Sequence, residues 1–218
     1  MRQVTWVVVD DHGDDADASG LPAPDRVVCA DSGLVHAQRL GLRVDLVVGD
    51  MDSVPAAALG AARDAGSEIE THPVAKAATD LALALARGGE GLTSGDLLVV
   101  LGGAGGRLDH ALANVHALAD PSLAHVQLHA RLGWADVHVV RDVAILELPL
   151  QATVSLLPSG GAALGITTEG LAYPLTGEDL HPWSTRGVSN IVTGTPVRIG
   201  LTDGCLLVVA PLPRKDNA

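Results

Sequence analysis

The sequence predicts an α/β protein in which a mostly parallel α/β sheet domain, residues 1–140, precedes a small antiparallel β-sandwich domain, residues 141–218. Short, continuous apolar runs alternate with helix-like stretches up to about residue 140, as in parallel sheets that are buried on both faces. From Arg141 onward, short strand-like runs are separated by Gly, Pro, Ser and Thr, with no helical period between them. The 218 residues leave room for one large domain or two small ones.

The first domain alternates strands with helices, which favours a parallel arrangement. Its expected strands are Val4–Val9, Val27–Ala30, Leu46–Gly49, Glu68–Thr71, Leu97–Leu101, Val126–His129 and Val137–Val140. Its expected helices are Leu34–Leu40, Pro55–Ala65, Thr79–Arg87 and Asp109–Leu118. Thr79 or Asp109 is expected to cap its helix, because short oxygen side chains favour that position. Gly41, Gly66 and Gly88 stand where glycines commonly end helices.

The second domain consists of short runs separated by turn-forming residues, which is typical of an antiparallel sandwich. Its expected strands are Ala144–Leu148, Thr153–Leu157, Ala163–Thr167, Val197–Leu201 and Cys205–Val209.

Composition narrows the class of protein. Aromatic residues make up 2 % of the chain and Phe is absent, so an aliphatic core is expected. The net charge of −12 argues against a nucleic-acid partner. Cys29 and Cys205 form no motif, which fits a reducing compartment. We find no signal-peptide pattern and no run of transmembrane length, so we expect no membrane partner and a cytoplasmic location.

Aspartates follow several of the predicted strands. Asp31 ends one apolar run, and Asp50 and Asp52 follow the next, separated by one residue. Ligands of open α/β sheets bind at the carboxyl ends of the strands, so these side chains should gather at one edge. Two carboxylates about 4 Å apart repel by roughly 4 kcal/mol at an effective dielectric of 20. Together with Asp80, at the start of a predicted helix, they favour a Mg²⁺ site over solvated turn residues.

A glycine-rich turn, Gly102 to His110, joins the fifth predicted strand to the next helix. Its glycines allow backbone N–H groups to approach phosphates, and Arg107 can bind a phosphate through two parallel hydrogen bonds. The turn is not a Walker A loop, because no Gly-Lys-Ser/Thr follows. It is not the dinucleotide fingerprint either, since Leu108 stands at the position of the last glycine. Lys76, just before a predicted helix, offers a point charge to a polyphosphate.

Together these segments resemble the thiamine pyrophosphokinase family over residues 26 to 210. In the first domain the matching motifs are Ala30-Asp31-Ser32-Gly33, Gly49-Asp50-Met51-Asp52-Ser53, Lys76-x-x-Thr79-Asp80 and Gly105-Gly106-Arg107-x-Asp109-His110. In the second domain they are Gly170-Leu171-Ala172-Tyr173-Pro174-Leu175 and Gly187-Val188-Ser189-Asn190.

The resemblance implies an activity: transfer of the terminal diphosphate of ATP to the hydroxyl of thiamine, giving thiamine diphosphate and AMP. It also implies a homodimer with its active site between subunits. By position, Asp50, Asp52 and Asp80 would hold Mg²⁺, with Asp31 supporting the site.

The resemblance assigns further residues to the two substrates. The polyphosphate would be bound by Lys76, Thr79, Gly105, Gly106 and Arg107. Asp109 would orient or deprotonate the thiamine hydroxyl, and with Asp31 and Arg107 it completes the catalytic set. Tyr173 would stack on thiamine, and Ser189 and Asn190 would line its pocket.

One departure from the family pattern keeps alternatives open. Ala77 stands where the family usually has an aspartate, and loss of a ligand or its support costs about 10- to 100-fold in metal affinity or activity. Ala77 keeps open a weakened homologue that binds thiamine or its diphosphate without turnover. A further alternative is a pyrophosphokinase for another hydroxymethyl heterocycle such as a pterin, with substrate choice set by the C-terminal domain. A metal-dependent phosphohydrolase is a more distant alternative.

Overall fold

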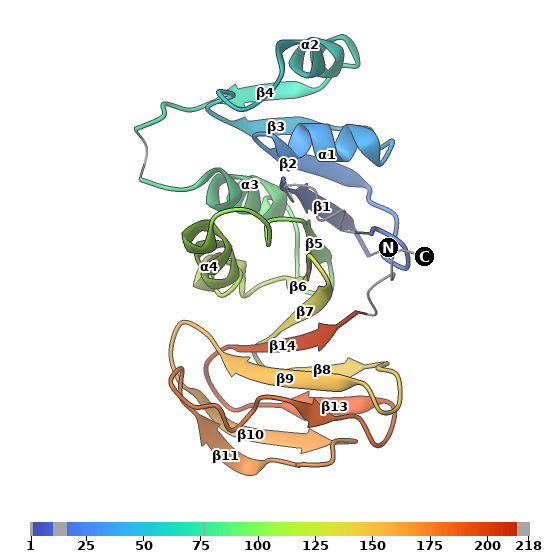
Figure 1. The fold of residues 1–218 in the computed structure, drawn as a ribbon, viewed down its shortest axis with the longest axis vertical. Coiled ribbons are helices and arrows are strands. Elements are labelled where there is room, and N and C mark those ends of the chain that lie inside the picture. The colour runs from blue at the N-terminus through green and yellow to red at the C-terminus, as the bar shows by residue number, and fades with distance from the viewer. Residues whose placement is uncertain (1, 11–16, 76, 213–218) are drawn as a thin grey trace. The chain divides into compact units, whose positions relative to one another are not determined.

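The structure, a computed structural model, describes residues 2–10, 17–75 and 77–212, arranged in two compact units (Figure 1). Unit 1 comprises residues 1–133 and unit 2 comprises residues 134–218. The sequence placed this division at residue 140. Strand β7 (Ala135–Val140), assigned there to the first domain, pairs with a strand of unit 2.

Unit 1 contains a parallel sheet, which confirms the predicted fold class. The strands are β1 (Val4–Val8), β2 (Arg26–Ala30), β3 (Leu46–Gly49), β4 (Glu68–Thr71), β5 (Leu97–Leu101) and β6 (Gln127–Leu132). Their order is β6-β5-β1-β2-β3-β4, and all neighbouring strands in this order pair in parallel. The order reverses at β1, which lies between β2 and β5. Open α/β sheets form their ligand crevice at such a switch point.

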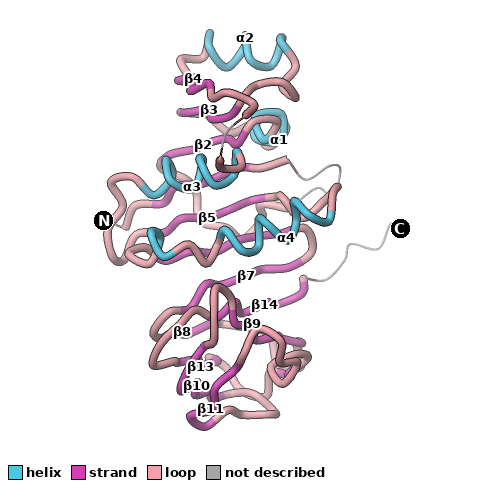
Figure 2. Tube along the Cα trace, turned by 90° about the vertical axis from the view of Figure 1, so that its left-hand side faces the viewer, coloured by secondary structure: helices cyan, strands magenta, loops and turns pink. Residues whose placement is uncertain are grey.

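Helices cover both faces of this sheet because alternate strand residues point to opposite sides. Trp6 and Val8 share a buried cluster with Leu34 and Ala37 of α1 (Gly33–Arg39) and with Ala62 of α2 (Ala56–Asp64). Figure 2 shows α3 (Asp80–Gly89) and α4 (Leu108–Ala117) side by side on one face of the strands.

Helix α3 packs on the face opposite α1. A Cβ added to its Gly88 would lie 2.7 Å from Val7 Cγ2 and 3.1 Å from Leu98 Cδ1. Gly88 therefore lies inside the helix, where it permits close packing. The prediction that Gly88 ends this helix is wrong. A glycine is suited to this position because it lets α3 approach the sheet closely, and it forms no turn there.

Of the other predictions about helix ends, three are confirmed and one is wrong. Gly41 and Gly66 follow α1 and α2 with φ of 68° and 90°, as predicted for glycines that end helices. Thr79 caps α3, since its Oγ1 accepts a hydrogen bond from the Ala82 backbone N–H at 3.2 Å. Asp109 is not a cap: Arg107 is the N-cap of α4, and Asp109 lies in the first turn.

Unit 2 forms two antiparallel sheets. Besides β7, its strands are β8 (Val143–Leu146), β9 (Thr153–Pro158), β10 (Ala163–Glu169), β11 (Thr176–Leu180), β12 (Asn190–Ile191), β13 (Val197–Gly200) and β14 (Leu206–Pro211). Within the unit the orders are β12-β9-β14-β7 and β11-β10-β13-β8. Leu156 and Leu206 from one sheet share a buried core with Ile166 and Ile199 from the other, as in a sandwich.

Strands β11 and β12 were not predicted. The sequence of β11, Thr-Gly-Glu-Asp-Leu, lacks an apolar run because it is an edge strand with mostly outward-facing residues. A one-turn helix, Pro121–Leu123, was also not predicted. The aliphatic core is confirmed, since Trp6 is the one aromatic among the buried core residues that the structure describes. In the described part of the chain, no helix has the length and apolar character needed to cross a membrane.

Candidate active site

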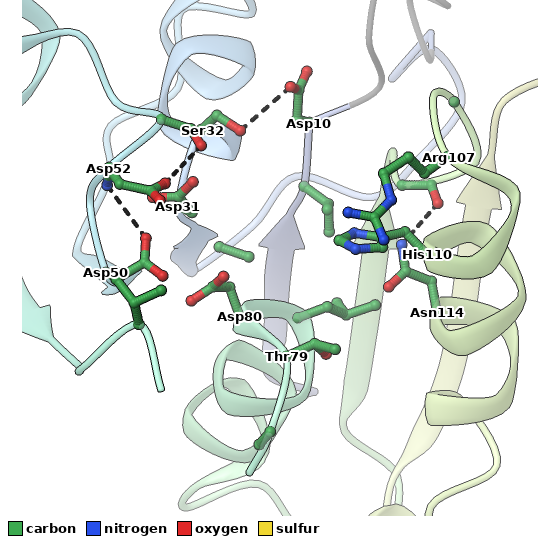
Figure 3. A pocket seen from close by; sticks show the side chains of 18 residues that line it. Asp10, Asp31, Ser32, Asp50, Asp52, Thr79, Asp80, Arg107, His110 and Asn114 are labelled. Atoms are coloured by element: carbon green, nitrogen blue, oxygen red, sulfur yellow. Dashed lines mark hydrogen bonds between the residues drawn. The ribbon is translucent and has the colours of Figure 1, made fainter. Parts of the chain in front are cut away.

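A pocket of about 690 Å³ opens at the carboxyl ends of the unit 1 strands (Figure 3). Segments that follow each of the strands β1 to β5 contribute to it, together with residues of α3 and α4. It is lined by Val9, Asp10, Ala30, Asp31, Ser32, Asp50, Asp52, Ser53, Val74, Ala78, Thr79, Asp80, Leu81, Gly103, Gly105, Arg107, His110 and Asn114. Its position at the switch point of the strand order explains why residues distant in sequence meet there.

Asp31 is the buried carboxylate of the pocket. It follows β2 with a φ of 45°, and its N–H donates to the Val48 carbonyl at 2.9 Å. The residue is 9 % exposed, and among the described residues its buried Oδ1 has no hydrogen-bond donor. Burial raises the pKa of Asp31, and the charges of Asp80 and Asp50 raise it further. A buried, charge-repelled oxygen of this kind fits a site for a cation.

Asp50 and Asp52 approach the same point as Asp31. Met51 between them adopts a φ of 64°, a conformation that non-glycine residues rarely take. One oxygen from each of Asp31, Asp50 and Asp52 lies within 4.8 Å of the others. Three carboxylate oxygens at this spacing match the hard oxygen ligands that Mg²⁺ prefers.

Asp80 reaches this cluster from the first turn of α3. Gly49 makes the approach possible, since a Cβ at that position would lie 3.0 Å from Asp80 Oδ1 and 3.0 Å from Asp31 Cβ. Figure 3 shows Asp31, Asp50 and Asp52 together, with the Asp80 carboxylate directed toward them from the start of α3. The structure thus gathers the predicted metal-site residues from three separate segments.

The glycine turn and α4 form the other side of the pocket, where Arg107, His110 and Asn114 lie (Figure 3). Buried Asn114 donates from Nδ2 to the Gly103 carbonyl at 2.8 Å, and the Gly103 N–H donates to the Asp10 carbonyl at 3.0 Å. These bonds fix the backbone of the turn. Gly105 lines the pocket and Gly106 does not, while Lys76 lies outside the described residues.

Arg107 and Asp109 are paired with each other. Arg107 Nε donates to Asp109 Oδ1 at 3.1 Å, and Nη2 donates to Oδ2 at 2.5 Å. Both side chains are mostly exposed, but only Arg107 lines the pocket. Arg107 holds the pKa of Asp109 at about 2.

Several residues that line the pocket received no functional role from the sequence. Asp10 ends the first apolar run, as Asp31 ends the second, and its Oδ2 accepts from Ser32 Oγ at 3.3 Å. An apolar run that ends in an aspartate was therefore a sequence signal that could have assigned Asp10 to the site. Ser53 donates from Oγ to Asp52 Oδ1 at 2.8 Å, and a serine in a turn carries no such signal. Asn114 and His110 lie on α4 beside apolar residues, where spacing alone does not reveal a role.

The residues predicted to bind thiamine lie in unit 2. Asn190 is 4 % exposed and clamps the segment that carries Tyr173. Its Oδ1 accepts from the Tyr173 N–H at 3.0 Å, and its Nδ2 donates to the Tyr173 carbonyl at 2.7 Å. The Tyr173 residue itself is 59 % exposed. Ser189, with a φ of 58°, donates its N–H to Ser155 Oγ at 3.1 Å. Asn190 thus positions the backbone that presents the tyrosine.

Fold and site together define an α/β protein that has an acidic ligand pocket at the switch point of a parallel sheet, and a separate β-sandwich unit. Residues 21–130 match the thiamin pyrophosphokinase catalytic domain, and residues 137–206 match the thiamin pyrophosphokinase vitamin B1 binding domain. The chain therefore belongs to the thiamine pyrophosphokinase family of enzymes.

Individual relatives agree with this assignment. Thiamine pyrophosphokinase 1 of Oryza sativa subsp. japonica is 25 % identical over 196 residues, which cover 79 % of this chain and 74 % of that protein. The crystal structure of thiamine pyrophosphokinase from Bacillus subtilis shares the fold, with a TM-score of 0.80 at 20 % identity, covering 97 % of this chain and 100 % of that one. The thiamin pyrophosphokinase of Candida albicans has a TM-score of 0.77 at 14 % identity, covering 96 % and 89 % of the two chains.

Proposed function

We propose that this protein transfers the terminal diphosphate of ATP to the hydroxyl of thiamine, giving thiamine diphosphate and AMP, with Mg²⁺ as cofactor. The observation that carries the proposal is the Asp31, Asp50 and Asp52 oxygen cluster facing the glycine turn across one pocket of the family's catalytic unit. Diphosphate transfer needs charge neutralisation and alignment of the reacting groups more than it needs covalent help from the protein.

The aspartates are the metal-binding part of the proposal. Asp50, Asp52 and Asp80 would hold Mg²⁺, and Asp31 would complete or support the site. The bound ion would neutralise the negative charge of the polyphosphate. The buried Oδ1 of Asp31 supports this assignment, because a carboxylate oxygen without a donor is costly to bury unless a cation or a proton accompanies it.

The opposite side of the pocket would bind the phosphates. The backbone N–H of Gly105, just before the N-cap of α4, suits a phosphate oxygen. We retain Gly106, which does not line the pocket, on the family resemblance. The guanidinium of Arg107 adds charge-assisted hydrogen bonds. Thr79 also lines the pocket, although its Oγ1 already accepts the capping hydrogen bond. We retain Lys76 as a phosphate ligand on the family resemblance alone.

For the acceptor, we propose that the exposed Tyr173 ring stacks on thiamine and that Ser189 and Asn190 complete its pocket. An aromatic face suits a cationic heterocycle. We further propose a homodimer whose active site is shared between subunits, as the family resemblance implies. Both cysteines are free and buried, which suits the reducing cytoplasm in which we place the reaction.

The test is an assay of the purified protein with ATP, Mg²⁺ and thiamine, scored by chromatography. Equal amounts of thiamine diphosphate and AMP are the expected result. Thiamine binding by calorimetry without AMP release would replace the proposal with the weakened homologue that Ala77 suggests. Turnover with a hydroxymethyl pterin in place of thiamine would redirect it to a different acceptor, and sedimentation equilibrium checks the dimer.

A further inference from the structure

The pair formed by Arg107 and Asp109 is a feature that the proposed reaction does not by itself explain. It is bidentate, with distances of 3.1 Å from Nε to Oδ1 and 2.5 Å from Nη2 to Oδ2. Arg107 occupies the N-cap position of α4 and Asp109 follows two residues later in the first turn, so both side chains extend from the start of one helix.

The two members of the pair face different surroundings. Arg107 lines the pocket beside Gly105 and His110, whereas Asp109 is absent from the pocket wall. Asp109 accepts one N–H of Nε and one of Nη2, which leaves the other N–H groups of the guanidinium for a ligand.

We infer that Asp109 is a positioning residue that acts through Arg107, by holding the guanidinium in the orientation that binds the transferred phosphates. This inference rests on the proposed function and replaces the role in deprotonation that the family resemblance gave to Asp109. The side chain of Arg107 is 71 % exposed. Without Asp109 it would therefore sample many rotamers, and the guanidinium would not be held in one orientation.

The electrostatics of Asp109 agree with this role. Arg107 is the main cause of its low pKa, about 2, and such a carboxylate is a weak proton acceptor at neutral pH. Asp109 also carries negative charge near the phosphates. However, the Asp109 side chain is 63 % exposed, so solvent and salt screen its repulsion of the phosphates. We therefore expect the ordering of the Arg107 guanidinium to outweigh this repulsion.

The test is a double-mutant cycle with Asp109→Asn, Arg107→Ala and the combined variant, measured as kcat/KM for ATP. We expect Asp109→Asn to lower kcat/KM about three- to tenfold, which is the effect of releasing one ordered side chain. In the Arg107→Ala background the same change should alter kcat/KM less than about twofold, since coupled residues are not additive. The pH dependence of kcat should keep its acidic limb in Asp109→Asn.

Asp64→Asn, an exposed aspartate at the end of α2, is the matched control and should leave kcat/KM unchanged. Urea unfolding of each variant verifies that it folds. A large loss of kcat by Asp109→Asn that persists in the Arg107→Ala background, or disappearance of the acidic limb, would overturn the inference in favour of a base.

A parallel measurement separates this inference from the proposed function. Mg–ATP binding to the same four proteins is measured by calorimetry in the absence of thiamine. If the wild type binds Mg–ATP but makes no thiamine diphosphate, the proposed reaction is wrong and the cycle in binding affinity still decides the role of Asp109. If the wild type does not bind Mg–ATP, both proposals are overturned.

Discussion

At the scale of single residues, the acidic cluster depends on unusual backbone conformations. Asp31 and Met51 both adopt positive φ, and these two positions turn the carboxylates of Asp31, Asp50 and Asp52 toward one point. Such conformations cost about 1–3 kcal/mol each and persist only where the surrounding structure holds them. Two of them beside one pocket agree with the ligand site that we propose there.

Asp50→Asn tests the metal site directly. Loss of one ligand charge is expected to reduce turnover about 10³-fold, equivalent to roughly 4 kcal/mol of barrier, and to raise the Mg²⁺ concentration needed for half-maximal rate. Steady-state rates over a Mg²⁺ titration measure both effects. Asp64→Asn, away from the pocket, is the control. Near-wild-type turnover of Asp50→Asn would show that Asp50 is not a ligand of the proposed metal site.

Gly49→Ala tests the close approach of Asp31 and Asp80. The added methyl would meet Asp31 Cβ and Asp80 Oδ1 at 3.0 Å each, so the aspartates must shift by a few tenths of an ångström. We expect about a tenfold loss of activity, because misplacement by 1 Å costs on the order of 100-fold. The control is Gly60→Ala, in α2 with open space around it, which should stabilise the fold by about 0.5–1 kcal/mol. Equal activity of both variants would contradict the packing argument.

At the scale of elements, α3 connects the sheet to the pocket. Its Gly88 packs against Val7 and Leu98, and its first residue is Asp80. The position of the Asp80 carboxylate therefore depends on the packing of the whole helix, including Gly88 two turns away. The sequence predicted the helix from its apolar period, but it gave no sign that Gly88 lies inside it.

Thr79→Ala tests the start of this helix. Removal of Oγ1 leaves the Ala82 N–H without its capping acceptor, which should lower the free energy of unfolding by about 1 kcal/mol. Urea denaturation measures the change, and Thr79→Ser, which keeps the acceptor oxygen, should recover most of it. If serine and alanine are equally destabilising, the capping bond is not the cause.

At the scale of the whole molecule, stability in acid depends on ion pairs that join separate elements. Glu70 on β4 accepts from Arg87 of α3 at 2.7 Å and 3.0 Å and contacts His72 at 2.7 Å. The hydrogen bonds from Arg87, followed by His72, lower the pKa of Glu70 below its usual 4.5. The unfolded chain therefore takes up this proton more readily than the folded one as the pH falls.

The stabilisation from Glu70 should accordingly be complete above about pH 4.5 and be lost as the pH falls below that value toward the lower pKa of the folded state. Glu70→Gln is expected to lower the free energy of unfolding by about 1 kcal/mol at pH 7, and by much less at pH 3. Urea unfolding at both pH values measures this. Arg87→Gln removes the partner of Glu70 and should reproduce most of this destabilisation. If Glu70→Gln lowers the free energy of unfolding equally at both pH values, the ion pair is not the source of the destabilisation.

The sequence by itself determined the fold class and the location of the cluster of aspartates. Continuous apolar runs such as Leu97–Leu101 require burial on both faces, which imposes a parallel sheet covered by helices. Polar residues directly after such runs, such as Asp31 and Asp50, must then share one edge of the sheet.

Only the tertiary structure decided which side chains meet. The order of strands brings Asp10, Ser32 and Asn114 to one pocket, and no spacing along the chain encodes that order. The pairing of Arg107 with Asp109, and the clamp of Asn190 on the backbone of Tyr173, depend on rotamers and on contacts across elements. Periodicity reports the burial of each segment separately, whereas a site is formed by distances between segments that only packing establishes.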